Sequence, residues 1–364
     1  NPEQPEHGEG ATFALLGIPH PPALFKVAAQ QAAAFHTGRV LPLPPQTRER
    51  DSAGRIRIGY LSCDFHNHAT AQLLVETLEK RNTRDFEVTL YSYGHDDHTA
   101  MQHRVRAACE HFVDMRAMGP REMAERIRAD GIDVLVELKG HTQGSRLAVL
   151  AYRAAPVQVS WLGFPGTTGM HCIDYFIGDP VATPLSHAAH YTECLAQLPH
   201  SYQPNDTRRR IADTPASRSE VGLPDDAFVF CCMNHVFKIM PKVFDVWMRV
   251  LTQVPGSVLM LYSDNAETQH NLRQEAAARG VEPGRLVFGG PIGTAHHLAR
   301  LRLCDLFLDS APYNAHTSGS DALWVGLPVL SCAGRTFPSR VGASLLHAVG
   351  LPELATDSFE AYEA

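Results

Sequence analysis

Short apolar runs alternate with longer segments of helical periodicity along most of the chain. In its first half, Ile56–Leu61, Phe86–Tyr93 and Ile132–Leu138 are apolar runs of the kind that predicts buried strands. Between them, residues 70–80 and 120–129 have apolar positions at helical spacing, and we predict a helix over each. Strands that alternate with helices form parallel sheets, so this half of the chain predicts a Rossmann-like α/β domain.

The second half repeats the alternation after an interruption at residues 199–218, which are charged, contain prolines and show no apolar period. Strands are predicted at residues 227–233 and 258–262, with helical segments between and after them. We therefore place a domain boundary in the interruption. The sequence predicts one Rossmann-like domain over residues 51–205 and a second over residues 206–364.

Residues 1–50 differ in pattern from the two predicted domains. A polar start at residues 1–10 is followed by the alanine-rich stretch Pro22–Gly38, which predicts a helix with a face of small residues. Prolines in the stretch 41–55 indicate a turn-rich connection. We interpret residues 1–50 as an N-terminal helical segment and linker.

The composition of the chain argues against several classes of partner. The chain has 364 residues, of which 44% are hydrophobic and 20% charged, as in globular proteins. Its net charge of −7 argues against a nucleic-acid partner bound through bulk charge. We find no apolar run long enough to span a membrane and no secretory pattern, so we predict no membrane partner. Eight scattered cysteines without a Cys-x-x-Cys spacing favour a reducing, cytoplasmic location.

The stretch LFLDSAPYNAHTSGSDALWVGLP, residues 306–328, is the most informative part of the sequence. An apolar run closed by Asp309 predicts a strand, and Ser318 to Asp321 has the Ser-x-x-acid spacing of a helix capping box. A hydroxyl-rich turn at a helix N-terminus offers free backbone N–H groups and a favourable dipole to a phosphate. Asp321, just inside the helix, is placed to reach a ribose hydroxyl. The alternative is that these residues only stabilise the helix start.

Two further loops of the second half follow predicted strands. Asn234–Lys238 ends in a lysine whose ammonium is suited to neutralise a leaving diphosphate; the alternative is a solvated surface lysine. His296 and His297 follow a glycine-rich turn, where an imidazole either stacks on a base or faces solvent. Loops that follow parallel strands gather at one edge of a sheet, so we predict that they converge on one cleft.

In the first half, Asp64 and His68 share one loop after a predicted strand. A histidine oriented by a carboxylate serves as a general base for a hydroxyl; alternatively, Asp64 caps a turn and His68 caps a helix. The sequence contains no Walker loop, no Gly-x-Ser-x-Gly elbow and no Asp-x-Asp metal motif. The dense group His95–His98 is interpreted as a polar loop rather than a metal site. Without such a metal motif, a fixed cation such as Lys238 together with a helix N-terminus would have to stabilise a leaving diphosphate, and we expect no cofactor.

Four segments, taken in order, resemble the catalytic region of the O-GlcNAc transferase and SPINDLY family. They are SCDFHNHAT (62–70), WLGFPGTTG (161–169), NHVFKI (234–239) and NAHTSGSDALWVGLPVLSCAG (314–334). The resemblance implies a GT-B fold, in which two Rossmann-like domains face a cleft, and an inverting, metal-independent glycosyltransferase. It also implies that the N-terminal helical segment is tetratricopeptide-like and that residues 206–364 bind the nucleotide sugar.

The resemblance implies a role for each matching residue. Lys238 would contact the donor diphosphate, Asp321 would bond the ribose, and His297 would stack near the uracil. His68 would lie beside donor and acceptor, where a general-base role has been proposed. His316, Thr317 and Ser318 would form the phosphate-binding turn. The implied nucleotide-sugar-binding residues are His235, Lys238, His297, His316, Thr317, Ser318 and Asp321.

The chain departs from the family pattern close to the implied base site. Animal members have Gln where this chain has His235 and Tyr where it has Phe237, and Thr294 replaces a Lys. These differences bear on the choice of donor and acceptor and leave the implied diphosphate contacts intact.

The function implied is transfer of N-acetylglucosamine from UDP-GlcNAc to Ser or Thr hydroxyls of proteins or peptides. One alternative is a SPINDLY-like O-fucosyltransferase that uses GDP-fucose on the same fold. A second is a nucleotide-binding scaffold without catalysis, for which loss of Lys238 or Asp321 would be expected, although both are present. A third is transfer to a lipid or small molecule, which predicts a basic or apolar membrane face.

Overall fold

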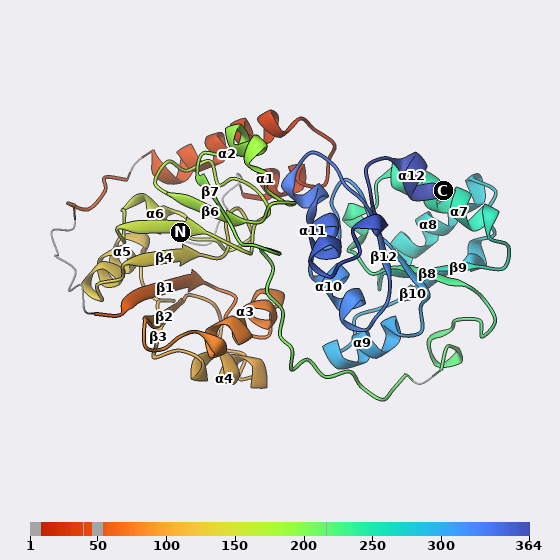
Figure 1. The fold of residues 1–364 in the computed structure, drawn as a ribbon, viewed down its shortest axis with the longest axis horizontal. Helices are drawn as coiled ribbons and strands as arrows, with labels where there is room; N and C mark the ends of the chain where they lie inside the picture. The colour runs from red at the N-terminus through yellow and green to blue at the C-terminus, as the bar shows by residue number, and fades with distance from the viewer. Residues whose placement is uncertain (1–8, 39, 46–53, 216) are drawn as a thin grey trace. The chain divides into compact units, whose positions relative to one another are not determined.

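The computed structural model describes residues 9–38, 40–45, 54–215 and 217–364. Most of the predicted polar start at residues 1–10, and much of the turn-rich connection at residues 41–55, lie outside the described residues. The chain divides into two compact units. The first contains the described residues through Leu15 and His20–Thr207, and the second contains Leu16–Pro19 and Arg208–Ala364 (Figure 1).

Described strands of the first unit form a seven-stranded parallel sheet in the order β3-β2-β1-β4-β5-β6-β7 (Figure 1). Its strands are β1 Ile56–Ser62, β2 Phe86–Ser92, β3 His111–Asp114, β4 Val134–Glu137, β5 Val157–Ser160, β6 Tyr175–Gly178 and β7 Cys194–Gln197. The predicted strands β1, β2 and β4 are confirmed. Strands β6 and β7 were not predicted, because each has only four residues and neither is buried along its whole length.

Two layers of helices cover this sheet. The helices are α1 Glu9–Leu15, α2 Pro22–Thr37, α3 Ala69–Lys80, α4 Ala100–Ala107, α5 Pro120–Ala129, α6 Ala148–Ala151 and the 3-10 turn η1 Leu185–His190. Helices α3 and α4 pack together, and α6 packs against both α5 and α2 (Figure 1). The apolar runs of the strands are therefore buried on both faces, as expected for a parallel sheet.

Helix α5 shows how local sequence sets these boundaries. Pro120 occupies the first turn, where its missing N–H costs nothing, and Glu122 accepts the backbone N–H of Gly119 at 2.8 Å. Met123 and Ile127, four positions apart, are fully buried on the face toward the sheet. The predicted helix over residues 120–129 is confirmed at both ends.

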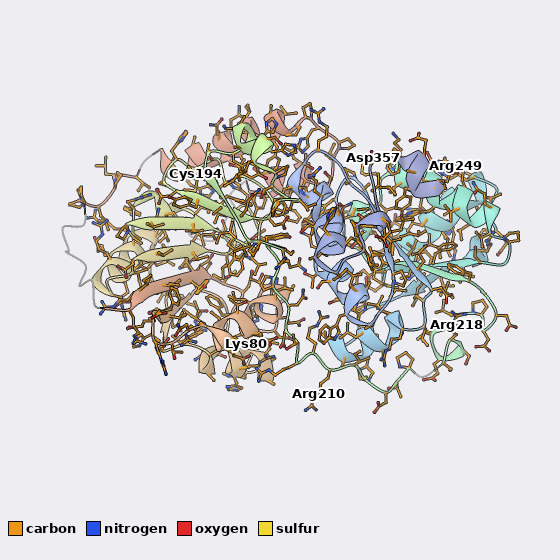
Figure 2. All side chains as sticks on the ribbon, viewed as in Figure 1. Lys80, Cys194, Arg210, Arg218, Arg249 and Asp357 are labelled. Atoms are coloured by element: carbon orange, nitrogen blue, oxygen red, sulfur yellow. The ribbon has the colours of Figure 1, made fainter. Side chains whose placement is uncertain are left out.

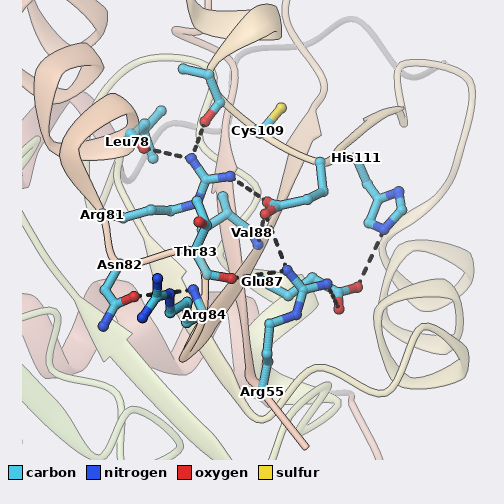
Figure 3. Close-up of polar contacts among 12 residues, drawn as sticks. Arg55, Leu78, Arg81, Asn82, Thr83, Arg84, Glu87, Val88, Cys109 and His111 are labelled. Atoms are coloured by element: carbon cyan, nitrogen blue, oxygen red, sulfur yellow. Dashed lines mark hydrogen bonds and ion pairs between the residues drawn. The ribbon is translucent and has the colours of Figure 1, made fainter.

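A polar network joins the starts of β1 and β2 to the ends of α3 and α4 (Figure 3). Arg81 pairs with Glu110 at 2.6 Å, and Glu110 also accepts the backbone N–H of Val88 at 2.9 Å. Arg55 pairs with Glu87 at 2.8 Å across the two strands. The network lies where the strands begin, so the opposite edge, where they end, remains for the loops that carry the candidate site.

Described strands of the second unit form a six-stranded parallel sheet in the order β10-β9-β8-β11-β12-β13. The strands are β8 Val229–Cys232, β9 Val258–Tyr262, β10 Leu286–Gly289, β11 Leu306–Leu308, β12 Val329–Cys332 and β13 Ala355–Thr356. The helices are α7 Pro241–Gln253, α8 Ala266–Ala278, α9 Thr294–Leu301, α10 Thr317–Trp324, α11 Val341–Ala348 and α12 Phe359–Glu363. Short 3-10 turns are η2 Ser219–Val221, η3 Val236–Lys238, η4 Pro283–Arg285, η5 Phe337–Ser339 and η6 Pro352–Leu354.

Trp247 of α7 anchors the core of this unit. Its side chain is fully buried, and its indole N–H donates to the hydroxyl of Tyr362 at 3.1 Å. The Tyr362 hydroxyl donates in turn to the backbone carbonyl of Asp309 at 3.1 Å. The buried face of α7 thus supports the end of β11 through α12.

The predicted N-terminal helical segment is present as α1 and α2, and its tetratricopeptide-like character stays a prediction. Helix α2 buries Phe25, Ala29 and Ala33 within the first unit. Ala29 lies so close to Gly169 that a Cβ added at Gly169 would approach the Ala29 carbonyl carbon to 2.3 Å. Small residues on both sides therefore allow backbone-to-backbone contact.

This contact predicts a large cost for Gly169→Ala. The φ of +73° at Gly169 already costs an alanine ~1–2 kcal/mol, and the overlap with the α2 backbone adds ~1–3 kcal/mol. The control is Gly222→Ala, with a φ of +72° and no described atom within 4 Å of its added Cβ. Scanning calorimetry should show a clearly larger loss of stability for Gly169→Ala; equal losses would refute the close packing of α2.

Candidate functional site

Both sheets have the strand order of a doubly wound fold. In the first unit β1 and β4 are neighbours, and in the second β8 and β11 are neighbours, with the chain winding away in opposite directions from each pair. The loops that follow such a pair separate and leave a crevice at the carboxyl ends of the strands, where ligands bind in open α/β sheets. The predicted site residues of the second unit follow β8, β10 and β11, and His68 follows β1.

The buried carboxylate of Asp309 organises the loops at the carboxyl ends of the strands of the second unit, where such a crevice is expected. It accepts hydrogen bonds from the Ser331 hydroxyl at 2.7 Å, the Ala315 N–H at 2.6 Å and the Asn234 amide at 3.3 Å. Burial raises the pKa of Asp309 to about 6, and the hydrogen bonds and the charge of Lys238 oppose the rise. A Cβ at Gly342 would lie 2.5 Å from this carboxylate, which explains the glycine at that position.

Lys238 places a cation against the turn between β11 and α10. Its ammonium donates to the carbonyl of Asn314 at 2.9 Å and lies 3.7 Å from the centre of the Tyr313 ring. Burial lowers the pKa of Lys238 to about 8, and the charge of Asp309 opposes the shift. The alternative of a solvated surface lysine is therefore wrong. An ammonium held at this point is suited to a phosphate group.

Asn234 links the two loops of this crevice and was not among the predicted site residues. Its amide donates to the Ser310 hydroxyl at 2.7 Å and to Asp309, and its carbonyl oxygen accepts from the Ser318 hydroxyl. Residue type alone carried no signal for this role, because an asparagine after a strand usually only forms a turn.

The start of α10 corrects one prediction. The helix begins at Thr317, with His316 as its N-cap, so Ser318 lies inside the first turn rather than at the cap position. The capping box from Ser318 to Asp321 is therefore wrong; Ser318 bonds to Asn234 instead. Burial holds the pKa of His316 well below its usual value, so its ring is neutral. Its Nε2 is buried and has no hydrogen-bond partner among the described residues.

Asp321 and His297 come together one turn further along α10. The His297 Nε2 lies 3.8 Å from an Asp321 carboxylate oxygen, and the other carboxylate oxygen pairs with Arg209. Burial, with the charges of Arg300 and Arg209, lowers the pKa of His297 to about 4. Arg209 was not among the predicted site residues, because its charged segment was interpreted only as part of a domain boundary.

His235 lies at the exposed rim of the same loops. Its ring is 5.2 Å from that of Phe237 and 6.5 Å from that of Tyr262, which makes an aromatic surface beside Lys238. The structure thus brings all seven predicted nucleotide-sugar-binding residues to the carboxyl edge of the second sheet. Their contacts with a ligand stay predictions.

In the first unit, His68 caps helix α3. Its Nδ1 accepts the backbone N–H of Thr70 at 3.2 Å, and one Asp64 oxygen lies 3.6 Å from the same nitrogen. A neutral imidazole that accepts at Nδ1 carries its hydrogen on Nε2. Partial burial lowers the pKa of His68, with Asp64 opposing, so the neutral form is favoured. In this arrangement His68 presents a donor, not a base, at its outer nitrogen.

Lys139 holds Asp64 from the neighbouring loop after β4. Its ammonium lies 2.9 and 3.1 Å from the two Asp64 oxygens, and both side chains are almost fully buried. Burial acts to raise the pKa of Asp64, but the charges of His68 and Lys139 outweigh it, and the pKa lies below its ordinary value. Glu137 fixes the loop by accepting the N–H groups of Lys139 and Gly140 at 2.7 Å. Lys139 was not among the predicted site residues, because its contact with Asp64 joins positions 75 residues apart in the chain.

The residues that the structure describes also give information on metal ions and membranes as partners. None of these residues forms a cluster of three or more His, Cys, Asp or Glu side chains suited to a metal ion. In the same part of the chain we find no helix with the length and apolar character needed to cross a membrane.

The sequence of the chain is similar to that of known glycosyltransferases. The pattern of Glycosyl transferase family 41 matches residues 41–214 and 207–364. A probable UDP-N-acetylglucosamine–peptide N-acetylglucosaminyltransferase SEC of Arabidopsis thaliana is 38% identical over 315 residues, which cover 85% of this chain and 32% of that protein. A probable enzyme of the same description, SPINDLY of rice, is 32% identical over 89% of this chain and 36% of its own length. The chain spans about a third of the length of these curated relatives.

Solved structures show the same fold. A mutant O-GlcNAc transferase of Thermobaculum terrenum superposes with a TM-score of 0.90 at 32% identity, covering 98% of this chain and 68% of that one. Anabaena HepE in complex with UDP-glucose has a TM-score of 0.51 at 13% identity, over 80% of this chain and 83% of that one, which shows a shared fold alone. The predicted fold of two Rossmann-like domains is confirmed.

The contact between Lys139 and Asp64 predicts the behaviour of His68. In Lys139→Met a nearby positive charge is lost and Asp64 is released toward His68, so the pKa of His68 should rise. Lys80→Met is the matched control, because Lys80 is exposed at the end of α3 (Figure 2). The pKa is measured by NMR titration of the histidine rings. A pKa of His68 that is unchanged in Lys139→Met would contradict the arrangement.

Proposed function

Because the chain belongs to glycosyltransferase family 41, we propose that it transfers N-acetylglucosamine from UDP-GlcNAc to Ser or Thr hydroxyls of a protein or peptide. We further propose that transfer inverts the anomeric carbon and requires no metal ion. The observation that supports the proposal most directly is the Lys238 ammonium held against the turn before α10. That turn offers a fixed cation and the N–H groups of a helix start to one diphosphate.

The reaction would proceed by one displacement. The acceptor oxygen forms a bond to the anomeric carbon on the face opposite the leaving group, while the bond from that carbon to the UDP phosphate oxygen breaks. The acceptor proton leaves for a base, and the negative charge gathers on the diphosphate. Stabilisation of this growing charge is the step for which a metal ion is otherwise needed. Lys238 and the start of α10 would supply it here.

We propose that His68, in the first unit, takes part in this reaction as a hydrogen-bond donor. Its Nδ1 is engaged by the Thr70 N–H, so its Nε2–H is the group that can bind an oxygen of the donor or acceptor. A general-base role would require the proton to move to Nδ1 and the Thr70 contact to break. We therefore propose that His68 positions the reacting groups.

The choice of donor is tested by calorimetry. UDP should bind with an affinity at least ~10-fold higher than GDP, which corresponds to ~1.4 kcal/mol. Incubation with labelled UDP-GlcNAc and a lysate, in the presence of EDTA, should yield labelled protein, and NMR of the product should show the inverted anomer. Tighter binding of GDP would instead support the fucosyltransferase alternative, and loss of transfer in EDTA would refute metal independence.

Lys238→Ala tests the role of the fixed cation. Removing a group that stabilises transition-state charge should lower kcat by ~100-fold or more. Lys242→Ala is the control, since Lys242 is an exposed lysine at the start of the adjacent α7. Because the pKa of Lys238 is about 8, UDP affinity should fall between pH 7 and pH 9 in the wild type and much less in Lys238→Ala. Unchanged turnover in Lys238→Ala would rule out the assignment.

A further inference from the structure

Arg209 belongs to the segment that leads into the second sheet, yet its side chain is only 7% exposed. The segment is fixed to the start of α9 by a hydrogen bond from the Ala212 N–H to the Ala295 carbonyl at 3.0 Å. The next residue, Arg210, is exposed and points away from the ribbon (Figure 2). The two neighbouring arginines therefore differ, and of the two only Arg209 has its side chain buried within the unit.

The buried end of Arg209 meets the carboxylate of Asp321. One Arg209 Nη donates to Oδ1 of Asp321, and the Asp321 side chain is itself only 12% exposed. A buried carboxylate without a partner would bind a proton or lose stability. Arginine is the one side chain that supplies a permanent charge at such a position. Arg209 therefore keeps Asp321 available as an ionised hydrogen-bond acceptor.

The second oxygen of Asp321 faces a donor at a distance too long for a hydrogen bond. Arg300 donates to Nδ1 of His297 at 3.0 Å, and because an arginine only donates, the hydrogen of the neutral ring is on Nε2. That Nε2 lies 3.8 Å from Oδ2 of Asp321. Among the described contacts of Asp321, the hydrogen bond from Arg209 goes to Oδ1, and Oδ2 has only this longer contact with His297.

Arg209 also carries an unused donor. Its Nε is buried and makes no hydrogen bond to any residue that the structure describes. A buried N–H without a partner is rare in folded proteins, and it calls for an acceptor supplied from elsewhere. The two open positions are thus one donor, on Arg209, and one acceptor, on Asp321, which are held together by an ion pair.

We infer that Arg209 is a ribose-binding residue of the donor site, acting together with Asp321. A ribose presents two neighbouring hydroxyls, each of which both donates and accepts, and so matches one donor beside one acceptor. Arg209 would keep Asp321 charged and oriented, and its Nε–H would bind a hydroxyl oxygen. This inference rests on the proposed use of a nucleotide sugar, but it concerns the ribose and holds for either base.

The test compares UDP with 2′,3′-dideoxy-UDP by calorimetry. In the wild type, loss of both hydroxyls should weaken binding by ~10-fold or more. In Arg209→Met, UDP should bind ~10-fold more weakly, and the preference for UDP over its dideoxy form should largely disappear. In Arg210→Met, affinity and preference should both match the wild type. An Arg209→Met variant that is folded and keeps the full preference would overturn the inference.

A second variant covers the case in which Arg209→Met does not fold. Arg209→Lys keeps the charge beside Asp321 but lacks the Nε–H donor, so it should retain part of the preference for the ribose form. A full wild-type preference in Arg209→Lys would show that the Nε donor is not used, and would refute that part of the inference. Melting curves without nucleotide identify loss of folding in either variant.

The pH dependence separates binding from a purely structural role. Without Arg209, burial would raise the pKa of Asp321 further, because the opposing charge is lost. UDP binding by Arg209→Met should therefore weaken more at pH 6 than at pH 8, relative to the wild type. His297 and Arg300 also face this region, so each variant is compared with the wild type at both pH values.

Failure of the proposed donor gives a different result from failure of this inference. If the wild type binds GDP rather than UDP, the same comparison is made with GDP and 2′,3′-dideoxy-GDP, and the ribose preference remains the readout. A nucleotide that binds equally well with and without its hydroxyls would overturn the inference and leave the diphosphate site intact. Absence of binding by either nucleotide would overturn both.

Discussion

The burial of a single carboxylate, that of Asp309, is the constraint on which the candidate donor site depends. A buried carboxylate needs several donors, and here they come from Ser331, Asn234 and the backbone of Ala315. Each of these bonds fixes a different piece of chain at the carboxyl edge of the sheet. The turn before α10 and the loop that carries Lys238 are therefore held in place before any ligand binds, which is the requirement for electrostatic stabilisation of a leaving group.

The two units share one arrangement of charged residues, but they differ in whether the lysine contacts the carboxylate directly. Each places a carboxylate and a lysine on the two loops that leave its central strand pair: Asp64 and Lys139 in the first, Asp309 and Lys238 in the second. In the first unit Lys139 and Asp64 form a direct ion pair. The charge of Lys139 is therefore neutralised within the unit, where it holds the loop that carries His68. In the second unit Lys238 bonds to the carbonyl of Asn314, and its positive charge remains available to an anion. Lys139, in its buried ion pair, therefore supports the structure, whereas Lys238 is suited to the chemistry.

Sequence patterns predicted the parallel strands well, because a strand covered on both faces is a continuous apolar run. The same rule missed β6, β7 and β13, which are short and are not buried along their whole length. The capping box at Ser318 was wrong for a related reason. Its spacing satisfied the local rule, but the Ser318 hydroxyl bonds to Asn234, which no pattern within the helix could indicate.

Local sequence is sufficient to predict the alternation of strands and helices, the position of Lys238 after a strand, and the polar turn at the start of α10. These features depend on neighbours within a few residues, which local periodicity and turn chemistry describe. Which charges meet, in contrast, follows from the tertiary fold. Arg209 and Asp321 are 112 positions apart, and Lys139 and Asp64 are 75 apart. Lys139 and Asp64 meet because a parallel sheet brings the ends of distant strands to one edge, and Arg209 reaches Asp321 because its segment is fixed to the start of α9. Burial then requires each charge to find a partner.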